Sequence, residues 1–211
     1  MRGVQPPSRF VSRLYHFLFS KPGLSLLYGY QGTYKTSLAL KALSLESARA
    51  RVLVLTGKHV VLEDPPGVIV MRLHTILDDL KLPFELEFLS DEKGLPLAVV
   101  YDSFVADFAG ARGYMASRAI LKSLVTCLAL LRDHAARRGS SVLLVSPRHP
   151  YTGNPPLWKF FSRFVERIVE INVNRGVVTA VQRALTLEPL ATWITLESEL
   201  REYLEDPEGL P

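Results

Sequence analysis

The residues with the clearest chemical potential lie in one short segment, residues 29–37, with the sequence GYQGTYKTS. A phosphate-binding loop has the pattern G-x-x-x-x-G-K-[ST], and Gly29, Lys35 and Thr36 stand at its required spacing. In such a loop, backbone N–H groups and the N-terminus of the following helix point at the phosphates. The lysine bridges the terminal phosphates, and the threonine hydroxyl reaches Mg²⁺. The segment therefore predicts a site for ATP with Mg²⁺.

One residue of the loop departs from the pattern, because Tyr34 stands where a glycine should precede the lysine. Glycine there lets the chain pass close to the phosphates without a Cβ atom. A tyrosine must either point its side chain outward, toward a base, a neighbouring subunit or DNA, or shift the loop. A strand–turn–helix that binds no nucleotide stays open as an alternative. The nucleotide-binding candidates are Gly29, Tyr30, Gln31, Gly32, Thr33, Tyr34, Lys35, Thr36 and Ser37.

A second polar residue, Asp102, ends the apolar run LAVVYD. An aspartate at the end of a strand beside a phosphate loop holds Mg²⁺ through water in many nucleotide-binding folds. Thr36 and Asp102 are therefore the two candidate protein ligands for Mg²⁺. The histidines show no metal-ligand spacing, so no other metal site is predicted.

The elements that must position these residues alternate between strand and helix. Strands are predicted at residues 24–28, 51–56, 68–73, 97–101 and 141–146, and helices at 10–19, 36–48, 75–82 and about 114–138. Apolar runs this continuous are typical of strands that are covered on both faces, as in a parallel sheet. The alternation predicts an α/β fold whose central sheet is mostly parallel and is flanked by helices.

The pattern changes after Pro147. Apolar and polar residues alternate around residues 174–176, which indicates a hairpin, and residues 191–196 read as a last strand. We therefore expect antiparallel strands at the C-terminal end of the sheet. Because no long linker interrupts the chain, residues 1–211 are taken as one domain, with an N-terminal arm or helix (1–21), a core (22–200) and an acidic tail (201–211).

The composition is that of a globular protein, with 48% hydrophobic and 22% charged residues and a formal net charge of +4. No apolar run reaches the roughly 20 residues that span a bilayer, so we expect no membrane span. Cys127 is the only cysteine and lies in an apolar helical run, which predicts a small buried side chain and a reducing, cytoplasmic location.

The phosphate-loop segment and Asp102, in this order of strands and helices, resemble the RecA/RadA recombinase superfamily, and most of all the archaeal RadA and RadB paralogues. The matching stretches are GLSLLYGYQGTYKTSLALKAL, VIVMRLHTILDDL, the long segment that begins AVVYDSF, and RALTLEPLATWITLESEL. The resemblance covers about residues 22–200 and implies a RecA-like P-loop NTPase fold. The chain is similar to a core-only paralogue, which lacks the small helical DNA-binding domain of full recombinases.

The sequence departs from this family where hydrolysis would be carried out. The resemblance implies an acid near the end of the second strand, and Lys58 stands there; a protonated lysine cannot be a general base. Glu63 and Asp64 are the weak candidates to replace that acid. The family's asparagine–glutamine-like pair after the fifth strand is replaced by Pro147 and Arg148. We therefore expect weak or absent ATP hydrolysis.

Nucleic-acid candidates lie in the segment RHPYTGNPPLWKFFSRF, where basic residues alternate with aromatic residues. Basic side chains follow the phosphates of a single strand and aromatic rings stack on its bases. The candidates are Arg148, Tyr151, Trp158, Lys159 and Arg163, together with Arg112 in AGARGY. The alternative is that Trp158 and its neighbours begin an element that covers the sheet edge.

The resemblance implies an ATP-binding protein that is accessory to homologous recombination and DNA repair. Its expected partners are single-stranded DNA and a recombinase or another repair protein, and it can form oligomers. Two alternatives stay open at this point. One is a protein-interaction module on a RecA scaffold with a vestigial nucleotide site, and the other is a KaiC-like NTPase in another process.

Overall fold

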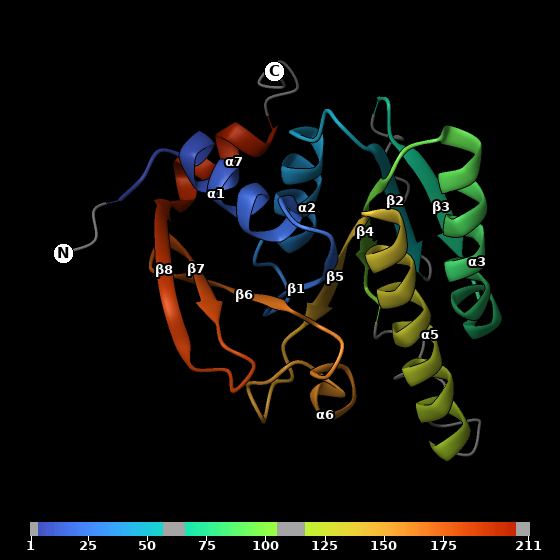
Figure 1. The fold of residues 1–211 in the computed structure, drawn as a ribbon. Helices are drawn as coiled ribbons and strands as arrows, with labels where there is room; N and C mark the ends of the chain where they lie inside the picture. The colour runs from blue at the N-terminus through green and yellow to red at the C-terminus, as the bar shows by residue number, and fades with distance from the viewer. Residues whose placement is uncertain (1–3, 57–65, 105–116, 206–211) are drawn as a thin grey trace.

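The computed structural model describes residues 4–56, 66–104 and 117–205. An eight-stranded sheet forms its centre, in the order β3-β2-β4-β5-β1-β6-β7-β8 (Figure 1). Its strands are β1 (Gly23–Gly29), β2 (Ala50–Thr56), β3 (Ile69–Leu73), β4 (Leu97–Asp102), β5 (Ser141–Pro147), β6 (Arg167–Asn174), β7 (Val177–Arg183) and β8 (Pro189–Leu196). All neighbours from β3 to β6 in this order pair in parallel, whereas β6–β7 and β7–β8 pair antiparallel. The expected α/β fold with a mostly parallel sheet and antiparallel C-terminal strands is confirmed.

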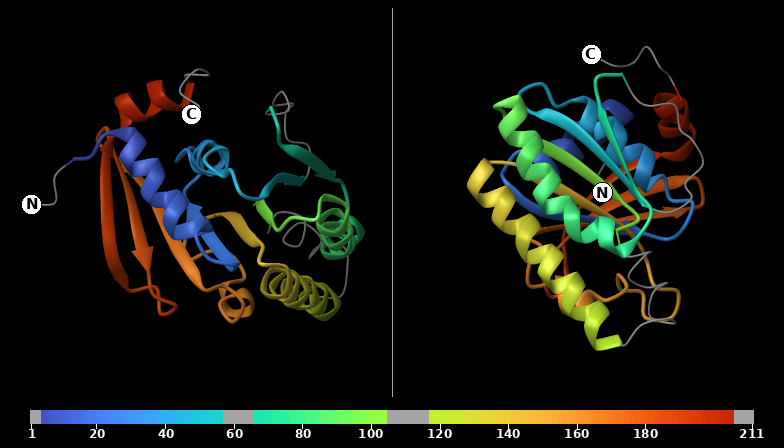
Figure 2. Two further views of the ribbon diagram at one scale, coloured as in Figure 1. Left: turned by 45° about the horizontal axis from the view of Figure 1, so that its top comes forward. Right: turned by 90° about the vertical axis from the view of Figure 1, so that its right-hand side faces the viewer.

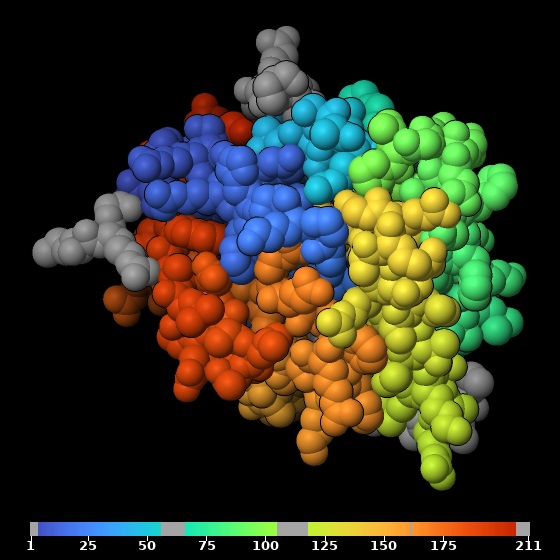
Figure 3. Space-filling view, viewed as in Figure 1, coloured from blue at the N-terminus to red at the C-terminus, as the bar shows by residue number. Residues whose placement is uncertain are grey.

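Helices cover both faces of the sheet, as Figure 2 shows from two further directions. They are α1 (Pro7–Phe19), α2 (Lys35–Ser44), α3 (Ile76–Lys93), α5 (Ser117–Arg138), α6 (Trp158–Phe161) and α7 (Glu197–Glu205). Side chains of α1, α2 and α7 pack in one buried cluster with one face of the strands. Side chains of α3, α5 and α6 pack in a second cluster on the other face. In the space-filling view of Figure 3, α1 and α5 form much of the visible surface.

The central strands are buried on both faces because successive side chains alternate between these two clusters. In β1, Leu26 and Tyr28 belong to the cluster under α5, while Leu27 belongs to the cluster under α1 and α2. Every residue of β1 and of β4 is buried. This double coverage explains why the strands read as continuous apolar runs.

Helix α3 is longer than the sequence predicts, since the prediction stopped at residue 82 and the helix continues through Pro83 to Lys93. Proline lacks the N–H group that would bond the carbonyl four residues earlier, which belongs to Asp79. The Cys127 thiol of α5 donates to that carbonyl at 3.3 Å instead. Cys127 is fully buried, as predicted, and burial raises the pKa of its thiol.

Helix α2 is shorter than predicted, since it ends at Ser44 rather than at residue 48. The chain turns away because the Glu46 carboxylate accepts a hydrogen bond from the Ala48 amide at 2.9 Å and from Arg49 at 3.2 Å. The predicted acidic tail also differs at its start, because residues 201–205 belong to α7. In the described residues no helix is both long and apolar enough to cross a membrane.

Candidate nucleotide site at the carboxyl ends of β1 and β4

The sheet brings the candidate residues to one edge. Strands β1, β5 and β4 lie side by side and run in the same direction, so their carboxyl ends meet there. Gly29 of β1 pairs with Pro147 of β5, and Asp102 ends β4 on the far side of β5. Ligands of open α/β sheets bind in the crevice outside such carboxyl ends.

Thr36 and Asp102 meet at this edge, although β5 lies between β1, which leads to the loop before Thr36, and β4, which ends at Asp102. The Thr36 hydroxyl donates a hydrogen bond to Asp102 Oδ2 at 3.0 Å. Asp102 is buried at the end of β4, and Thr36 lies in the first turn of α2. The sequence-predicted pair of Mg²⁺ ligands is therefore brought together by the fold.

The Lys35 ammonium lies over the loop that precedes it. It donates to the Tyr30 carbonyl at 2.5 Å and approaches the Thr33 hydroxyl at 3.4 Å. Burial lowers the pKa of Lys35 below that of an ordinary lysine, while the nearby Asp102 carboxylate acts in the opposite direction. An ammonium group that is partly withdrawn from water interacts strongly with an anion.

Two glycines fit the backbone of the loop. A Cβ atom at Gly29 would lie 2.3 Å from the backbone oxygen of Ile171, so β6 passes too close for any other residue. Gly32 has a φ of +79°, which favours glycine, and a Cβ there would meet open space. The first glycine is therefore needed for packing and the second for chain direction.

Tyr34 adopts the left-handed conformation, with φ 59° and ψ 15°, at the N-cap of α2. The backbone thus takes the shape that glycine favours, and the side chain turns away toward α7. Its hydroxyl donates to Glu197 Oε1 at 2.8 Å and accepts from Arg201 Nη2 at 3.0 Å. Of the two options the sequence left open, the tyrosine points outward, and it contacts its own chain.

A second polar cluster lies beside the loop and was not predicted. Glu170 of β6 is buried, and its carboxylate accepts from Arg148 at 2.5 Å and forms an ion pair with Arg183. The Tyr28 hydroxyl of β1 also donates to it at 3.3 Å. Burial and the Glu170 carboxylate raise the pKa of Tyr28 to about 12, so its hydroxyl keeps its proton. The available signal was a lone glutamate inside the apolar stretch RIVEINV.

Arg148 therefore has a structural role that the sequence did not indicate. Besides its bond to Glu170, its guanidinium carbon lies 4.8 Å from the centre of the Tyr30 ring, and its amide donates to the Gly29 carbonyl at 2.8 Å. The side chain thus connects β6 to the phosphate loop. This nucleic-acid candidate is therefore engaged in contacts within the protein.

The other nucleic-acid candidates divide into two groups. Tyr151 is 92% exposed, and Lys159 and Arg163 are exposed as well. Trp158 is instead packed against the core under α5, together with Phe160. Trp158 thus begins the short helix α6 and packs against the core, and no contact places it over an edge strand in the described residues.

Four residues of the sequence argument lie outside the described part of the chain. They are Lys58, Glu63, Asp64 and Arg112. The predictions about a replacement catalytic acid and about the arginine in AGARGY stay predictions.

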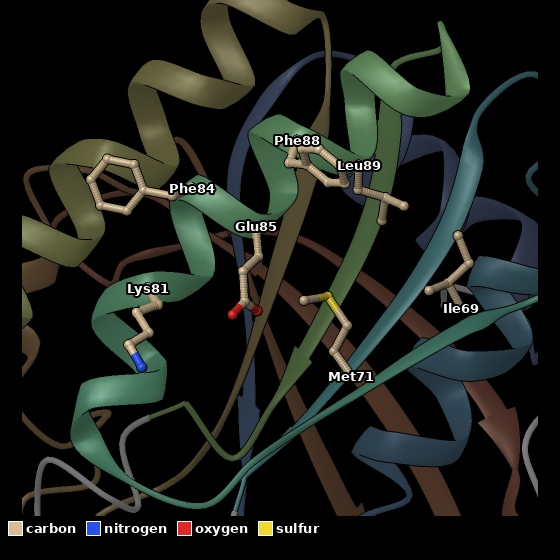
Figure 4. A pocket seen from close by; sticks show the side chains of 7 residues that line it. All are labelled: Ile69, Met71, Lys81, Phe84, Glu85, Phe88 and Leu89. Carbon is tan, nitrogen blue, oxygen red and sulfur yellow. The ribbon is translucent and has the colours of Figure 1, made fainter.

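An apolar groove lies away from the phosphate loop, between the edge strand β3 and helix α3 (Figure 4). Its volume is about 530 Å³, and its lining comprises Ile69, Met71, Lys81, Phe84, Glu85, Phe88 and Leu89. Phe84 is 64% exposed and Phe88 is 71% exposed. Large apolar side chains gathered on a surface mark contact sites for partners.

Comparison with models of known protein families finds no match for this chain, and comparison with curated protein sequences finds none either.

Proposed function

We propose that this chain is a RecA-like P-loop protein that binds ATP with Mg²⁺ and hydrolyses it slowly or not at all. We propose further that it is an accessory protein of recombinational DNA repair. The observation that carries the nucleotide proposal is the 3.0 Å hydrogen bond between the Thr36 hydroxyl and Asp102, with Lys35 beside it. These residue types at these positions are what a phosphate loop needs.

The donor set fits Mg²⁺. The ion prefers hard oxygen ligands, keeps several waters and usually takes only one or two protein ligands besides phosphate oxygens. The Thr36 hydroxyl and the Asp102 carboxylate are such ligands, and no group of three or more acidic, histidine or cysteine side chains competes for a metal within the described ranges. A bound Mg²⁺ would neutralise phosphate charge, and Lys35 would add a second positive group.

The expectation of weak hydrolysis is supported by what the nearby carboxylates do. A general base must have an oxygen within hydrogen-bond reach of the attacking water. Asp102 accepts from Thr36, and Glu170 accepts from two arginines. Both are occupied by other groups, and Lys58 stands at the sequence position where the resemblance implies an acid.

The nucleotide proposal is tested by thermal unfolding with and without millimolar Mg·ATP. A ligand that binds only the native state must raise the melting temperature. We expect an ATP-dependent rise that Lys35→Ala abolishes, while Lys122→Ala, at an exposed lysine of α5, leaves it unchanged. No rise in the native protein, or the same rise in Lys35→Ala, overturns the proposal.

The DNA proposal is supported by three exposed side chains, Tyr151, Lys159 and Arg163. Basic and aromatic groups of this kind bind single strands with affinities that fall as salt rises. We expect weak binding to a fluorescent single strand that Lys159→Gln with Arg163→Gln reduces further at low salt. Binding that is absent at low salt, or that ignores salt, contradicts this part of the proposal.

A second candidate function, protein interaction, is favoured by the groove between β3 and α3. The exposed residues Leu77, Lys81, Phe84 and Phe88 are spaced by four, three and four positions, as in the seam of paired helices. Lys81 and Glu85 lie symmetrically about Pro83, so an antiparallel second copy of α3 would set each lysine against the copy's glutamate. The occupant that this charge pattern fits is therefore a second copy of this chain.

Sedimentation over a range of protein concentrations tests this pairing. We expect a dimer that Lys81→Glu weakens and that Lys81→Glu combined with Glu85→Lys restores. Phe84→Glu should yield a monomer, whereas Leu190→Glu, at an exposed leucine of β8, should not change the association. A wild-type protein that stays monomeric at every concentration rules out the pairing.

A further inference from the structure

Helix α7 reaches the phosphate loop through one side chain. The Tyr34 hydroxyl is shared by Glu197, the first residue of α7, and by Arg201, one turn later. The Tyr34 ring also packs against the apolar cluster that α7 shares with α1 and α2. Because Tyr34 is the N-cap of α2, the same residue ends the loop and contacts α7.

Helix α7 is fixed beside α2 at further points. Leu200 is fully buried in the shared cluster, and the Lys41 ammonium in the last turn of α2 lies 4.7 Å from the centre of the Tyr203 ring. The Glu197 amide donates to the Gly176 carbonyl in the β6–β7 turn at 2.9 Å. Figure 1 shows α7 on the same side of the sheet as α1 and α2. The helix thus links the antiparallel strands to both ends of α2.

The backbone at Tyr34 needs this support. A φ of 59° is comfortable for glycine but strained for a residue with a Cβ atom, and such strain persists only when the surroundings hold it. The hydrogen bonds that the Tyr34 hydroxyl donates to Glu197 and accepts from Arg201 hold the side chain, and the side chain holds the backbone. Lys35 and Thr36 follow directly, so their directions depend on the same turn.

We propose that Tyr34 is a positioning residue through which α7 sets the affinity of the loop for a nucleoside triphosphate. This inference rests on the proposed function, because the proposed function identifies the ligand as a nucleoside triphosphate. With the contacts to α7 made, the left-handed turn is fixed and the side chains of Lys35 and Thr36 face the phosphates. Without them, the turn relaxes and affinity falls. Coupling between two sites is reciprocal, so the nucleotide stabilises the docking of α7 by the same factor.

The first test needs no nucleotide. The double variant Glu197→Ala with Arg201→Ala changes only α7, and its effect is read by amide hydrogen exchange in residues 30–37. We expect faster exchange there than in the wild type. Tyr15→Phe is the matched control, because it also removes a tyrosine hydroxyl bond, at 3.3 Å to Glu46, beyond the other end of α2. Unchanged exchange in residues 30–37 of the double variant overturns the inference, whatever ATP does.

The second test measures the ATP dissociation constant in a double-mutant cycle. When Tyr34 is kept, the α7 double variant should bind Mg·ATP about fivefold more weakly than the wild type. This factor is at the lower end of the usual range for coupled sites. In the Tyr34→Gly background, glycine adopts the turn without support. The same α7 change should then leave the affinity unchanged. An equal loss in both backgrounds would mean that α7 acts on folding in general.

The two proposals fail in different ways. If the wild type binds no ATP, the proposed function fails, and the coupling is still judged by the exchange of residues 30–37. If ATP binds and Lys35→Ala abolishes binding, the nucleotide part of the proposed function stands. An α7 variant that then matches the wild type in both exchange and affinity overturns the inference alone.

Discussion

Two pairs of strands place polar side chains near one edge of the sheet. Strands β1 and β4 do so at their carboxyl ends, whereas the second pair joins the end of β5 to Glu170, the fourth residue of β6. The two pairs use these side chains differently. At the first pair, Thr36 and Asp102 share one hydrogen bond and Lys35 lies over the loop. At the second pair, Arg148 and Glu170 form an ion pair inside the protein. The first arrangement is the one on which the proposed phosphate site rests, and the second joins β6 to the loop through contacts within the protein.

This difference shows why residue type alone does not assign a role. An arginine after a strand beside a phosphate loop has the charge to bind phosphate. A buried glutamate on the next strand changes that role, because the glutamate would be costly to leave unpaired. The position of one partner thus separates a candidate ligand contact from a structural contact.

The largest expected effect comes from Glu170→Ala. The change leaves Arg148 and Arg183 without their common partner, and breaking a buried ion pair in this way costs about 3–5 kcal/mol of unfolding free energy. Urea denaturation measures the loss. The control is Glu166→Ala, whose side chain is 46% exposed and whose ion pair with Arg132 spans 3.8 Å, for which we expect less than about 1 kcal/mol. Equal losses of unfolding free energy in both variants would contradict the structural role that we assign to Glu170 and Arg148.

Asp102→Asn should act on ligand binding more than on folding. The amide is a weaker Mg²⁺ ligand, so the extra thermal stabilisation by Mg·ATP over ATP with a chelator should disappear. We expect affinity for Mg·ATP to fall about tenfold, which corresponds to about 1.4 kcal/mol. Thr36→Val should produce a similar loss, and the double variant should lose little more because both act on one ion. If Asp102→Asn keeps the full extra thermal stabilisation by Mg·ATP, Asp102 is not a ligand of Mg²⁺.

A partly exposed cluster between α3 and α5 provides a reference for the cluster around Glu170. Glu87 of α3 lies 2.9 Å from His134 Nδ1 and accepts hydrogen bonds from Arg138 and Arg137 of α5. These contacts, that to His134 first, lower the pKa of Glu87 from 4.5 to about 2. A carboxylate with a depressed pKa stabilises the fold above its unfolded pKa and loses that contribution as the pH falls.

We therefore expect stability to fall between about pH 4.5 and pH 2, and Glu87→Gln to weaken that dependence. Because the Glu87 carboxylate and both arginines are partly exposed, although His134 is buried, the contribution at neutral pH is discounted to about 1 kcal/mol. Chemical denaturation at several pH values measures the slope. A slope that is the same with glutamine at position 87 would assign the acid sensitivity to other carboxylates.

Much of the fold was predictable because its signals are local. Apolar runs of strand length, separated by helical spacing, predicted the order of elements and the parallel sheet, and the glycine-rich loop located the candidate site. The features that were missed depend on residues distant in sequence. Helix α3 continues through Pro83, and the carbonyl that the proline leaves without its N–H partner accepts from the Cys127 thiol, which lies 48 positions from Asp79 in the sequence.

The roles of Tyr34 and Arg148 were also beyond local reasoning. Tyr34 is explained by Glu197 and Arg201, and Arg148 is explained by Glu170. Neither partner stands near its residue in the sequence, and no motif joins them. What the sequence did indicate was that Tyr34 departs from the phosphate-loop pattern and that Arg148 departs from the pattern implied by the proposed resemblance.

The smallest expected effect on ligand binding belongs to Arg148→Gln. Its guanidinium is engaged by Glu170 and by the Tyr30 ring, so we expect the ATP dissociation constant, measured by calorimetry, to change by no more than about twofold. The unfolding free energy should fall, since Glu170 loses one partner. Calorimetry at temperatures below the melting range measures ATP affinity separately from this loss of stability. If affinity instead falls as far as in Lys35→Ala, Arg148 leaves Glu170 when the nucleotide binds. Arg148 at the end of β5 would then belong to the proposed nucleotide site, and the division between the two regions would hold only for the protein without its ligand.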